Sequence, residues 1–267
     1  KKGSPHDIRQ YRPITLLTCD LKLFTSILAR RIAKVTHQIC GPQNTAIPGR
    51  QISDSTMTLH VLQQMLTKEG REGYAIFLDW EKCFDLISWV YIHHAMAALG
   101  FGPFILGWLR TLYHLEQPLM GMVLVNGSFS APFPITRGIP QGDSVSSIMQ
   151  VVVFEGVSRL IRANSHIGIT TPSHREGGGD LIISHVQYAD DTTGLCCTLA
   201  AVMVFPTIVT MVGKAMASRL NHQKTLGLAL GACPPMHELQ QCGIMWAGLT
   251  DDAPHMLIAL GAPFSQQ

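Results

Sequence analysis

Three carboxylates in two separate segments are the side chains of this chain best suited to chemistry. Asp190 and Asp191 are adjacent and follow an apolar run at 181–187. This pattern predicts a β-hairpin with both acids at its tip. Asp79 ends a second apolar run, 74–78, which is also typical of a strand. If the strands pair side by side, the three carboxylates meet at one end of a sheet.

Such a cluster is unfavourable unless cations neutralise it, because nearby carboxylates repel one another strongly. Mg²⁺ prefers oxygen ligands and is typically held by one or two carboxylates, water and substrate phosphate. The pattern therefore predicts a two-metal phosphoryl-transfer site at Asp79, Asp190 and Asp191, with two Mg²⁺ ions or, alternatively, Mn²⁺. The opposing interpretation treats these acids as ordinary turn and strand-end residues, where aspartate is common.

Composition predicts a packed globular chain. With 267 residues, 46% of them hydrophobic, it can form one large core or two subdomains. The longest apolar stretch, 199–212, contains Pro206, Thr207 and Thr210, so we expect it to fall short of the roughly 18 apolar residues of a membrane span. The polar N-terminal segment does not resemble a signal peptide. Seven cysteines without a C-x-x-C pair indicate free thiols in a reducing compartment rather than a zinc site.

The net charge of +2 is unevenly distributed. Residues 1–50 hold nine Lys or Arg against two Asp, a balance of +7, so the remainder carries 11 basic and 16 acidic residues, or −5. A basic part joined to an acidic one suggests that the first binds a polyanion while metal ions occupy the second. A solvated surface with ordinary charge scatter is an equal alternative.

Helical and strand patterns alternate along the chain. Apolar spacing predicts a helix over 20–38, capped by Asp20, and a second one that stops at Glu69-Gly70. Asn126-Gly127 favours a type I′ hairpin turn. Further helices are expected at 88–99, at 104–115, after Gly142 and around 207–220. Strands separated by helices, without a repeat or a long linker, predict an α+β fold with interleaved subdomains.

Five blocks in a fixed order give the chain a family resemblance. They are Tyr11-Arg12-Pro13-Ile14-Thr15-Leu16-Leu17, Gly49-Arg50-Gln51-Ile52, Phe77-Leu78-Asp79-Trp80-Glu81-Lys82-Cys83-Phe84-Asp85, Arg137-Gly138-Ile139-Pro140-Gln141-Gly142 and Tyr188-Ala189-Asp190-Asp191. In this order they resemble the reverse transcriptase domain of LINE-type (non-LTR) retrotransposons, related to group II intron reverse transcriptases. A lone Y-A-D-D string would be weak evidence, whereas five ordered blocks that span nearly the whole chain are specific.

The resemblance implies a right-hand polymerase fold with an antiparallel palm sheet packed on helices. Residues 1–72 would form the fingers and residues 73–267 the palm, with a helical fingers insertion at about 86–120. The chain would end at the start of the primer-grip region, with the thumb absent. We therefore expect part of a larger retroelement polyprotein with an endonuclease and a thumb. It would act in the nucleus and cytoplasm of a eukaryotic host, without a membrane.

The resemblance also implies an RNA-directed DNA polymerase that uses an RNA template, a DNA primer and dNTPs. Asp79, Asp190 and Asp191 would hold two Mg²⁺ ions, which activate the primer 3′-hydroxyl and stabilise the leaving pyrophosphate. Lys224 matches a lysine that protonates pyrophosphate as a general acid.

Other matching residues would contact the nucleotide or the nucleic acid. Phe84 matches a steric gate that excludes the ribose 2′-hydroxyl, and Arg50 suits the triphosphate because a planar guanidinium fits phosphate oxygens. The remaining implied contacts are Trp80, Gln141 and Gly142 with the nucleotide, and Arg12 and Tyr188 with the nucleic acid. The alternatives are a plain core residue for Phe84 and a solvated loop arginine for Arg50, and the role of Arg12 is left open.

One block departs from the family pattern. The family usually has Pro-Leu-Ser-Pro after Gln-Gly-Asp, whereas residues 144–147 here are Ser-Val-Ser-Ser. Proline favours helix starts, so we expect a looser helix start, partly compensated by a serine N-cap. Two alternatives remain open. One is a catalytically inactive nucleic-acid-binding remnant, and the other is an RNA-dependent RNA polymerase, disfavoured by Phe84 and by Ala189 where such enzymes usually have glycine.

Overall fold

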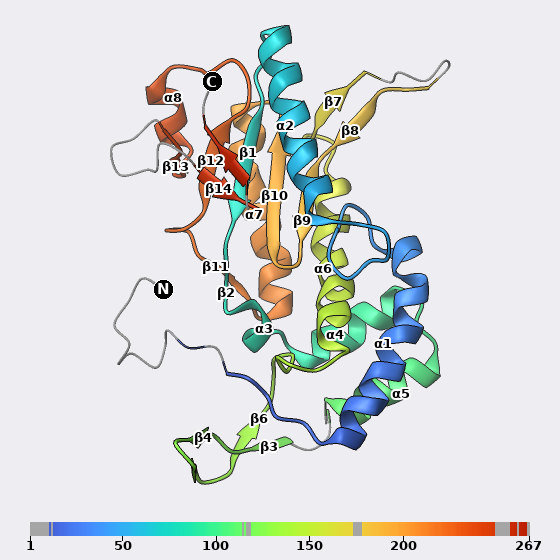
Figure 1. Ribbon diagram of the computed structural model, residues 1–267. Coiled ribbons are helices and arrows are strands. Elements are labelled where there is room, and N and C mark those ends of the chain that lie inside the picture. Colours follow the sequence, from blue (N-terminus) through green and yellow to red (C-terminus); the bar gives the residue numbers. More distant parts are fainter. Residues whose placement is uncertain are drawn as a thin grey trace.

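A mixed β-sheet lies at the centre of the molecule, with helices on both faces (Figure 1). The computed structural model describes residues 11, 13–113, 115, 119–172, 178–248, 257–260 and 262–265. Within these residues the sheet has five strands in the order β13-β12-β1-β10-β9. They are β1 (Tyr74–Leu78), β9 (His185–Tyr188), β10 (Asp191–Cys196), β12 (Leu226–Ala229) and β13 (Met245–Trp246). β12 and β13 run in parallel, and the other neighbours are antiparallel.

The remaining elements surround this sheet. The described helices are α1 (Cys19–Ile39), α2 (Ile52–Glu69), α3 (Cys83–Leu86), α4 (Trp89–Ala98), α5 (Pro103–Leu112), α6 (Ser146–Arg162), α7 (Leu199–Met216) and α8 (Met236–Gln241). Short strands pair in twos: β2 (Trp80–Glu81) with β11 (Arg219–Leu220), β3 (Leu119–Gly121) with β6 (Phe133–Ile135), β4 (Leu124–Val125) with β5 (Ser128–Phe129), β7 (Ile169–Thr171) with β8 (Leu181–Ile183), and β14 (Leu257–Ala259) with β15 (Ala262–Phe264).

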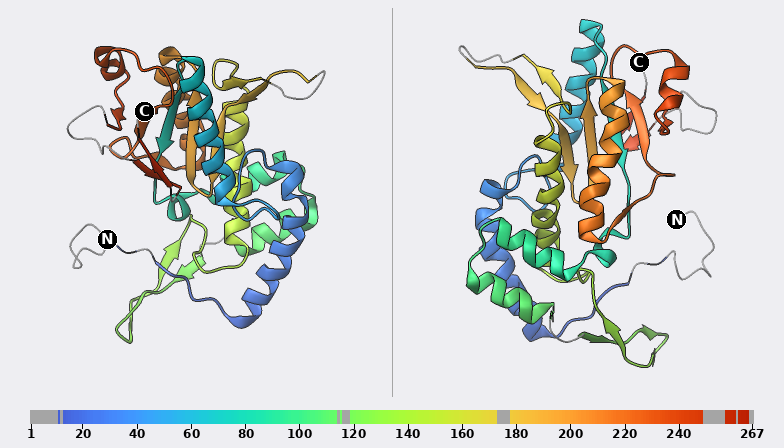
Figure 2. Two further views of the ribbon diagram at one scale, coloured as in Figure 1. Left: turned by 45° about the horizontal axis from the view of Figure 1, so that its top comes forward. Right: turned by 180° about the vertical axis from the view of Figure 1, so that it is seen from behind.

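Alternate residues of β1 face two different cores, because successive side chains of a strand point to opposite faces. Tyr74 and Ile76 pack in the larger core with residues of α6 and α7, whereas Ala75 packs in the smaller core with leucines of α2. Helices α6 and α7 therefore cover one face and α2 covers the other, as the two views of Figure 2 show. Burial on both faces fixes the register of β1 and thus the position of Asp79 at its end.

Close contact between α7 and the sheet depends on a glycine. A Cβ atom added at Gly194 in β10 would lie 2.1 Å from Cζ of Phe205 on α7. Glycine therefore lets this buried ring lie directly on the strand that begins at Asp191.

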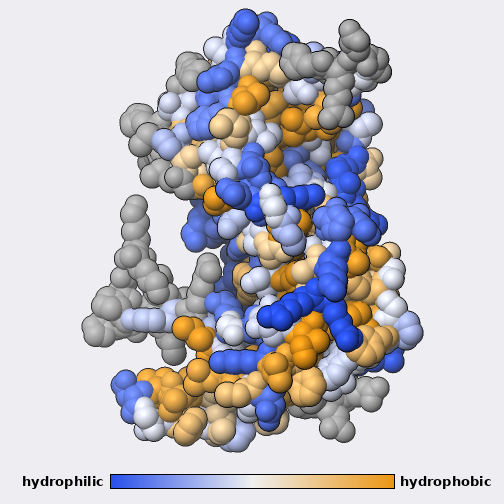
Figure 3. Space-filling view, turned by 45° about the vertical axis from the view of Figure 1, so that its right-hand side comes forward, coloured by the Kyte–Doolittle hydropathy of each residue, from blue (hydrophilic) through white to orange (hydrophobic). Residues whose placement is uncertain are grey.

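Helices α1, α4 and α5 and the hairpins β3–β6 lie below the sheet in Figure 1, and buried side chains of the three helices join the larger core. Its surface is rich in apolar side chains, and Figure 3 shows them gathered at the bottom of the molecule. Met120, Leu124, Val125 and Phe129 are among the exposed ones. The predicted type I′ turn at Asn126-Gly127 is confirmed, since it joins β4 to β5 with φ of 48° and 81°.

The predicted helices are present, but two predicted caps are wrong. Thr18, not Asp20, caps α1, because its hydroxyl accepts a hydrogen bond from Leu21 N at 3.4 Å. Helix α6 begins after Val145 without a side-chain cap, so the expected serine N-cap is absent there. Ser146 instead donates its hydroxyl to the Pro140 carbonyl oxygen at 2.6 Å.

Helix α7 is longer than expected. It begins at Leu199 rather than near residue 207, with Thr198 as its N-cap, and continues through Pro206. Among the described helices it is the one whose length and hydropathy match a membrane span, contrary to the sequence expectation. Its inner face, which includes Val202 and Val209, is buried in the larger core. This packing keeps the helix continuous at Pro206, although proline cannot donate the backbone hydrogen bond of this position.

Candidate active site

Two segments that are far apart in the sequence bring the predicted acids to one end of the sheet. β1 pairs antiparallel with β10, with Leu78 opposite Thr192. Asp79 follows Leu78, and Asp191 precedes Thr192, so these two carboxylates leave the same end of the strand pair. Asp190 lies in the turn between β9 and β10, one residue before Asp191. The predicted strand and the predicted hairpin are therefore neighbours in the sheet.

Two cavities open at this sheet end, and Asp79 and Lys224 line both of them. The first has a volume of about 380 Å³ and contains Asp190 in its wall. The second has a volume of about 280 Å³ and contains Asp191 instead. Asp190, in the turn, and Asp191, at the start of β10, therefore line different cavities. The expected convergence is thus pairwise: each adjacent acid shares a cavity with Asp79.

The donors suit a hard divalent cation. Asp79 and Asp190 are both half-buried and line the same open cavity, and Mg²⁺ usually keeps several waters beside one or two carboxylates. Within the described part of the chain, no three His, Cys, Asp or Glu side chains form a metal-binding group. The pair of Asp79 and Asp190 suits one Mg²⁺ ion with water and phosphate as further ligands. The binding of two ions by all three acids stays a prediction.

A tight turn places Lys224 beside Asp79. Asn221 N donates to the Asp79 carbonyl oxygen at 2.8 Å, and the Asn221 carbonyl accepts from Lys224 N at 3.1 Å and Thr225 N at 3.0 Å. These bonds tie the turn to the end of β1. Lys224 Nζ consequently lies 3.7 Å from Asp79 Oδ2, in a pair whose side chains are partly exposed to solvent.

The loop 137–142 is fastened to the segment that follows Asp79. Gly138 N donates to the Ile87 carbonyl oxygen at 2.8 Å, and Ile139 N donates to that of Phe84 at 2.6 Å. Gly138 has φ of 91°, and a Cβ atom there would lie 2.8 Å from the Asp85 carbonyl oxygen, so only glycine fits this contact. Gln141 Nε2 donates to Asp85 Oδ1 at 3.4 Å. Phe84 and Gln141 both line the larger cavity, together with Asp79 and Asp190.

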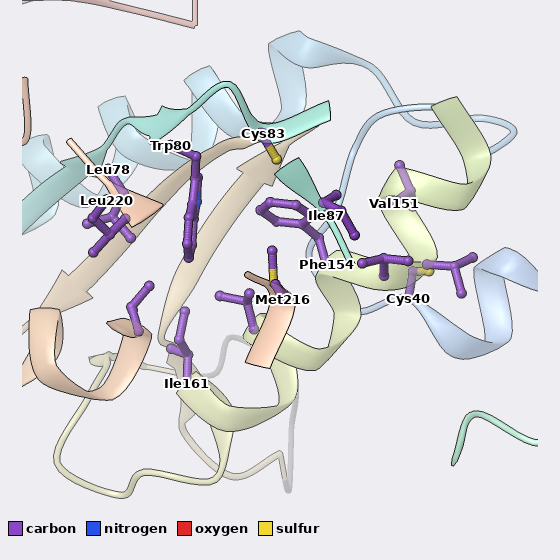
Figure 4. Packing of buried hydrophobic residues seen from close by; sticks show 14 of the residues in the cluster. Cys40, Leu78, Trp80, Cys83, Ile87, Val151, Phe154, Ile161, Met216 and Leu220 are labelled. Atoms are coloured by element: carbon purple, nitrogen blue, oxygen red, sulfur yellow. The ribbon is translucent and has the colours of Figure 1, made fainter. Parts of the chain in front are cut away.

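Trp80 lines the larger cavity but is mainly a core residue. Only 5% of its surface is exposed, and its ring meets Phe154 edge-on with centroids 5.6 Å apart (Figure 4). Gly142 has φ of 102° and approaches the Thr15 carbonyl. Tyr188 is half-buried at the end of β9, opposite Asp191.

The structure gives Arg50 backbone partners within its own loop. Its Nη1 donates to the carbonyl oxygens of Cys40, Gly41 and Gln43, and Arg50 lines neither of the two cavities. These bonds do not test the predicted contact between Arg50 and the triphosphate, which stays a prediction. Arg12 lies outside the described residues.

Gln43 is a site residue that the sequence did not point to. Its side-chain amide is bonded to the backbone of Ala189, within the turn that carries Asp190. The two residues are 146 positions apart, so no periodic pattern connects them. A glutamine beside Gly41-Pro42 in a loop was the sole local signal.

Residues 1–249 match the family described as reverse transcriptase (RNA-dependent DNA polymerase). The chain belongs to the reverse transcriptase family. This reverse transcriptase domain is also 28% identical over 233 residues to the Transposon TX1 uncharacterized 149 kDa protein of Xenopus laevis. The match covers 87% of the domain and 17% of that protein, so the domain spans about a sixth of its relative. The predicted likeness to LINE-type elements is confirmed.

Solved structures support the fold of the reverse transcriptase domain. It matches apo telomerase from Candida tropicalis, truncated from its C-terminal domain, with a TM-score of 0.52 and 11% identity over 80% of this chain and 41% of that one. Telomerase from Candida albicans, in complex with a TWJ fragment of telomeric RNA, matches with a TM-score of 0.54 and 13% identity over 80% of this chain and 36% of that one. At these identities the likeness shows the shared fold of helices and sheet.

Proposed function

We propose that this domain is an RNA-directed DNA polymerase of a retroelement polyprotein, which adds dNTPs to a primer 3′-hydroxyl along an RNA template. The observation that carries the proposal is the cavity shared by Asp79, Asp190 and Lys224 at the end of paired strands. Membership of the reverse transcriptase family supports the reaction class. The geometry supplies what phosphoryl transfer needs, namely carboxylates for cations and an ammonium for a developing negative charge.

The proposed architecture is a right hand, with residues 1–72 as fingers, residues 73–267 as palm and a fingers insertion at about 86–120. The central sheet with α6 and α7 supports the palm assignment, since it carries the acids. The position of α1, α4 and α5 below the sheet in Figure 1 supports the fingers assignment.

The proposed mechanism assigns tasks to the three acids and to Lys224. Asp79, Asp190 and Asp191 would hold two Mg²⁺ ions, which when bound lower the pKa of the primer hydroxyl and neutralise charge on the triphosphate. The ammonium of Lys224 donates a proton to the leaving pyrophosphate. The carboxylate of Asp79, 3.7 Å from Nζ, keeps that ammonium at the cavity.

Other residues of the larger cavity would select and orient the nucleotide. Phe84 is half-buried and packs against the larger core, so its ring has little freedom to move away from a ribose 2′-hydroxyl. The amide of Gln141 offers a hydrogen bond to the sugar or base. Arg50, Trp80, Gly142 and Tyr188 complete the proposed contacts.

An RNA template is the proposed polyanionic partner. Arg30, Arg31 and Lys34 are all exposed on α1, which gives the proposed fingers a basic surface. The relative from Candida albicans was solved in complex with an RNA fragment. A retroelement protein of this kind would act in the nucleus and cytoplasm of its host, with an endonuclease and a thumb supplied by other parts of the polyprotein.

A primer-extension experiment tests the proposal. Poly(rA) annealed to oligo(dT), Mg²⁺ and labelled dTTP are given to the chain, and UTP replaces dTTP in a parallel reaction. We expect incorporation of dTTP and not of UTP. Salt-sensitive RNA binding without incorporation would instead indicate the inactive remnant, and preferential use of UTP would indicate an RNA polymerase.

A further inference from the structure

Gln43 grips the backbone of the turn that presents Asp190. Its Oε1 accepts hydrogen bonds from Ala189 N at 2.9 Å and Thr45 N at 3.1 Å, and its Nε2 donates to the Ala189 carbonyl oxygen at 3.0 Å. Only 1% of its surface is exposed. We propose that Gln43 is a positioning residue, which sets the direction of the Asp190 carboxylate through the Ala189 peptide. The inference rests on the proposed function.

The segment around Gln43 pairs with β9 in the manner of an additional strand at the edge of the sheet. The Gln43 backbone forms a parallel bridge with Gln187 of β9. Gln187 N donates to the Pro42 carbonyl oxygen at 3.3 Å, and Asn44 N donates to the Gln187 carbonyl oxygen at 2.9 Å. The side-chain amide of Gln43 extends this pairing beyond the end of β9 to Ala189, which lies outside the described strands.

Ala189 needs such a grip because of its backbone conformation. Its φ is 56°, in the left-handed region that is unfavourable for residues other than glycine. A strained turn keeps its shape only when surrounding contacts over-determine it. Gln43 bonds both the N–H and the C=O of Ala189. Asp190 is the next residue, so rotation of the Ala189 peptide would turn the Asp190 carboxylate away from the cavity that Asp190 shares with Asp79.

The loop that carries Gln43 is itself held firmly. Glu155 on α6 is 1% exposed and accepts a hydrogen bond from Gly41 N at 2.9 Å. Arg162 forms an ion pair with the same carboxylate. From the other side, Arg50 donates to the Gln43 carbonyl oxygen at 2.7 Å. Gln43 is thereby fixed to the buried helix α6, so it can act as a rigid support for the turn.

A variant series separates positioning from general stabilisation. Gln43→Met keeps the length of the side chain and removes all three hydrogen bonds. Gln43→Glu keeps the acceptor oxygen and replaces the Nε2 donor, so it removes the bond to the Ala189 carbonyl. The matched control is Gln63→Met, since Gln63 is also buried, 3% exposed, and donates one hydrogen bond to the Ser265 carbonyl oxygen at 2.8 Å.

Three measurements on the folded chain test the proposal: amide hydrogen exchange of a peptide covering 186–192, Mn²⁺ affinity by electron paramagnetic resonance, and steady-state dTTP incorporation. In Gln43→Met we expect amide exchange in this peptide to be at least about tenfold faster and Mn²⁺ affinity to be about tenfold weaker. We expect kcat to fall by roughly 10- to 100-fold, the usual effect of residues that support metal ligands, and KM for dTTP to change less. Exchange in α6 should be unchanged. Gln63→Met should match the wild type in all three.

Wild-type exchange and Mn²⁺ affinity in a folded Gln43→Met protein would overturn the proposal. If Gln43→Met does not fold, the same measurements on Gln43→Glu decide, with faster exchange expected. A wild-type chain that fails to incorporate dTTP would refute the proposed polymerase. The exchange and Mn²⁺ measurements would still decide the role of Gln43, so the two failures are distinguishable.

Discussion

Lys224 Nζ lies 3.7 Å from Asp79 Oδ2, and this ion pair joins the turn after β11 to the end of β1. The side chains are 69% and 42% exposed, respectively. Ion pairs in such solvent-exposed positions contribute little to folding, typically about 0–1 kcal/mol. The position of Lys224 between two cavities therefore has more consequence for chemistry than for stability.

Substitution of Lys224 by methionine should separate these two effects. We expect kcat for dTTP incorporation to fall about 100-fold, the usual contribution of a positioned proton donor. The free energy of unfolding should change by less than about 1 kcal/mol. Single-turnover kinetics and urea titration measure the two quantities. Lys68→Met, at an exposed site on α2, is the control, and equal activity of the two variants would remove Lys224 from the mechanism.

Phe84→Ala should relax the choice of sugar. With the ring removed, the ratio of UTP to dTTP incorporation should rise at least about tenfold, because a steric contact on this scale contributes roughly that much discrimination. The variant should also lose about 2 kcal/mol of stability, since Phe84 is half-buried against the core. Competition assays with both nucleotides measure the ratio. An unchanged ratio in a folded variant would show that Phe84 is a packing residue alone.

Ala189→Gly should relieve backbone strain in the turn that carries Asp190. The φ of 56° disfavours alanine, and glycine adopts this region freely, so we expect the free energy of unfolding to rise by about 0.5–1 kcal/mol. Thermal and urea unfolding measure the change. Ala97→Gly, at an exposed position in helix α4, should have the opposite sign and cost up to about 1 kcal/mol. A loss of stability in both variants would contradict the strain argument.

His185 should make the fold sensitive to acid. Burial, with a further contribution from Arg162, lowers its pKa to about 3, and both ring nitrogens lie 2.9 Å from the hydroxyls of Ser184 and Ser158. The unfolded state, with a pKa of about 6.5, binds the proton first. The contribution of His185 to the free energy of unfolding is therefore largest above about pH 6.5 and falls as the pH is lowered toward 3. At pH 5 the loss from this group is about 2 kcal/mol.

Urea unfolding of His185→Gln at pH 7 and pH 5 tests this sign. The variant should lose about 2 kcal/mol less than the wild type between the two pH values, because glutamine does not titrate. His37→Gln, at an exposed histidine on α1, should behave as the wild type. A wild-type pH dependence in His185→Gln would show that other groups cause the acid sensitivity.

The elements that carry the acids were predictable because their signals are local. The apolar run 74–78 forms β1 as predicted. The run 181–187 is divided between β8, which pairs with β7, and β9, which forms the predicted hairpin with β10 beside β1. The start of α7 was missed because Pro206 suggested a break, whereas burial of Val202 and Phe205 against the sheet maintains the helix. Such tertiary packing has no signature in a single stretch of sequence.

The support of the site was less predictable than its acids. Gln43 contacts Ala189 across 146 positions, and a glutamine in a loop has no pattern that identifies its partner. The contact of Arg50 with the triphosphate stays a prediction, but its partners in the structure were not foreseen from the sequence. The structure gives it carbonyl partners in the same loop, a role that depends on how the loop folds back rather than on residue type.

Incorporation of a single dTTP onto oligo(dT) annealed to poly(rA) is the most direct test of the proposed roles of Asp79 and Asp190. The rates to compare in Mg²⁺ are those of the wild type, Asp79→Asn, Asp190→Asn and the exposed Asp180→Asn. We predict that Asp79→Asn and Asp190→Asn each reduce the rate at least about a thousandfold, equivalent to roughly 4 kcal/mol, while Asp180→Asn retains wild-type activity. Wild-type rates with asparagine at position 79 or 190 would contradict this prediction.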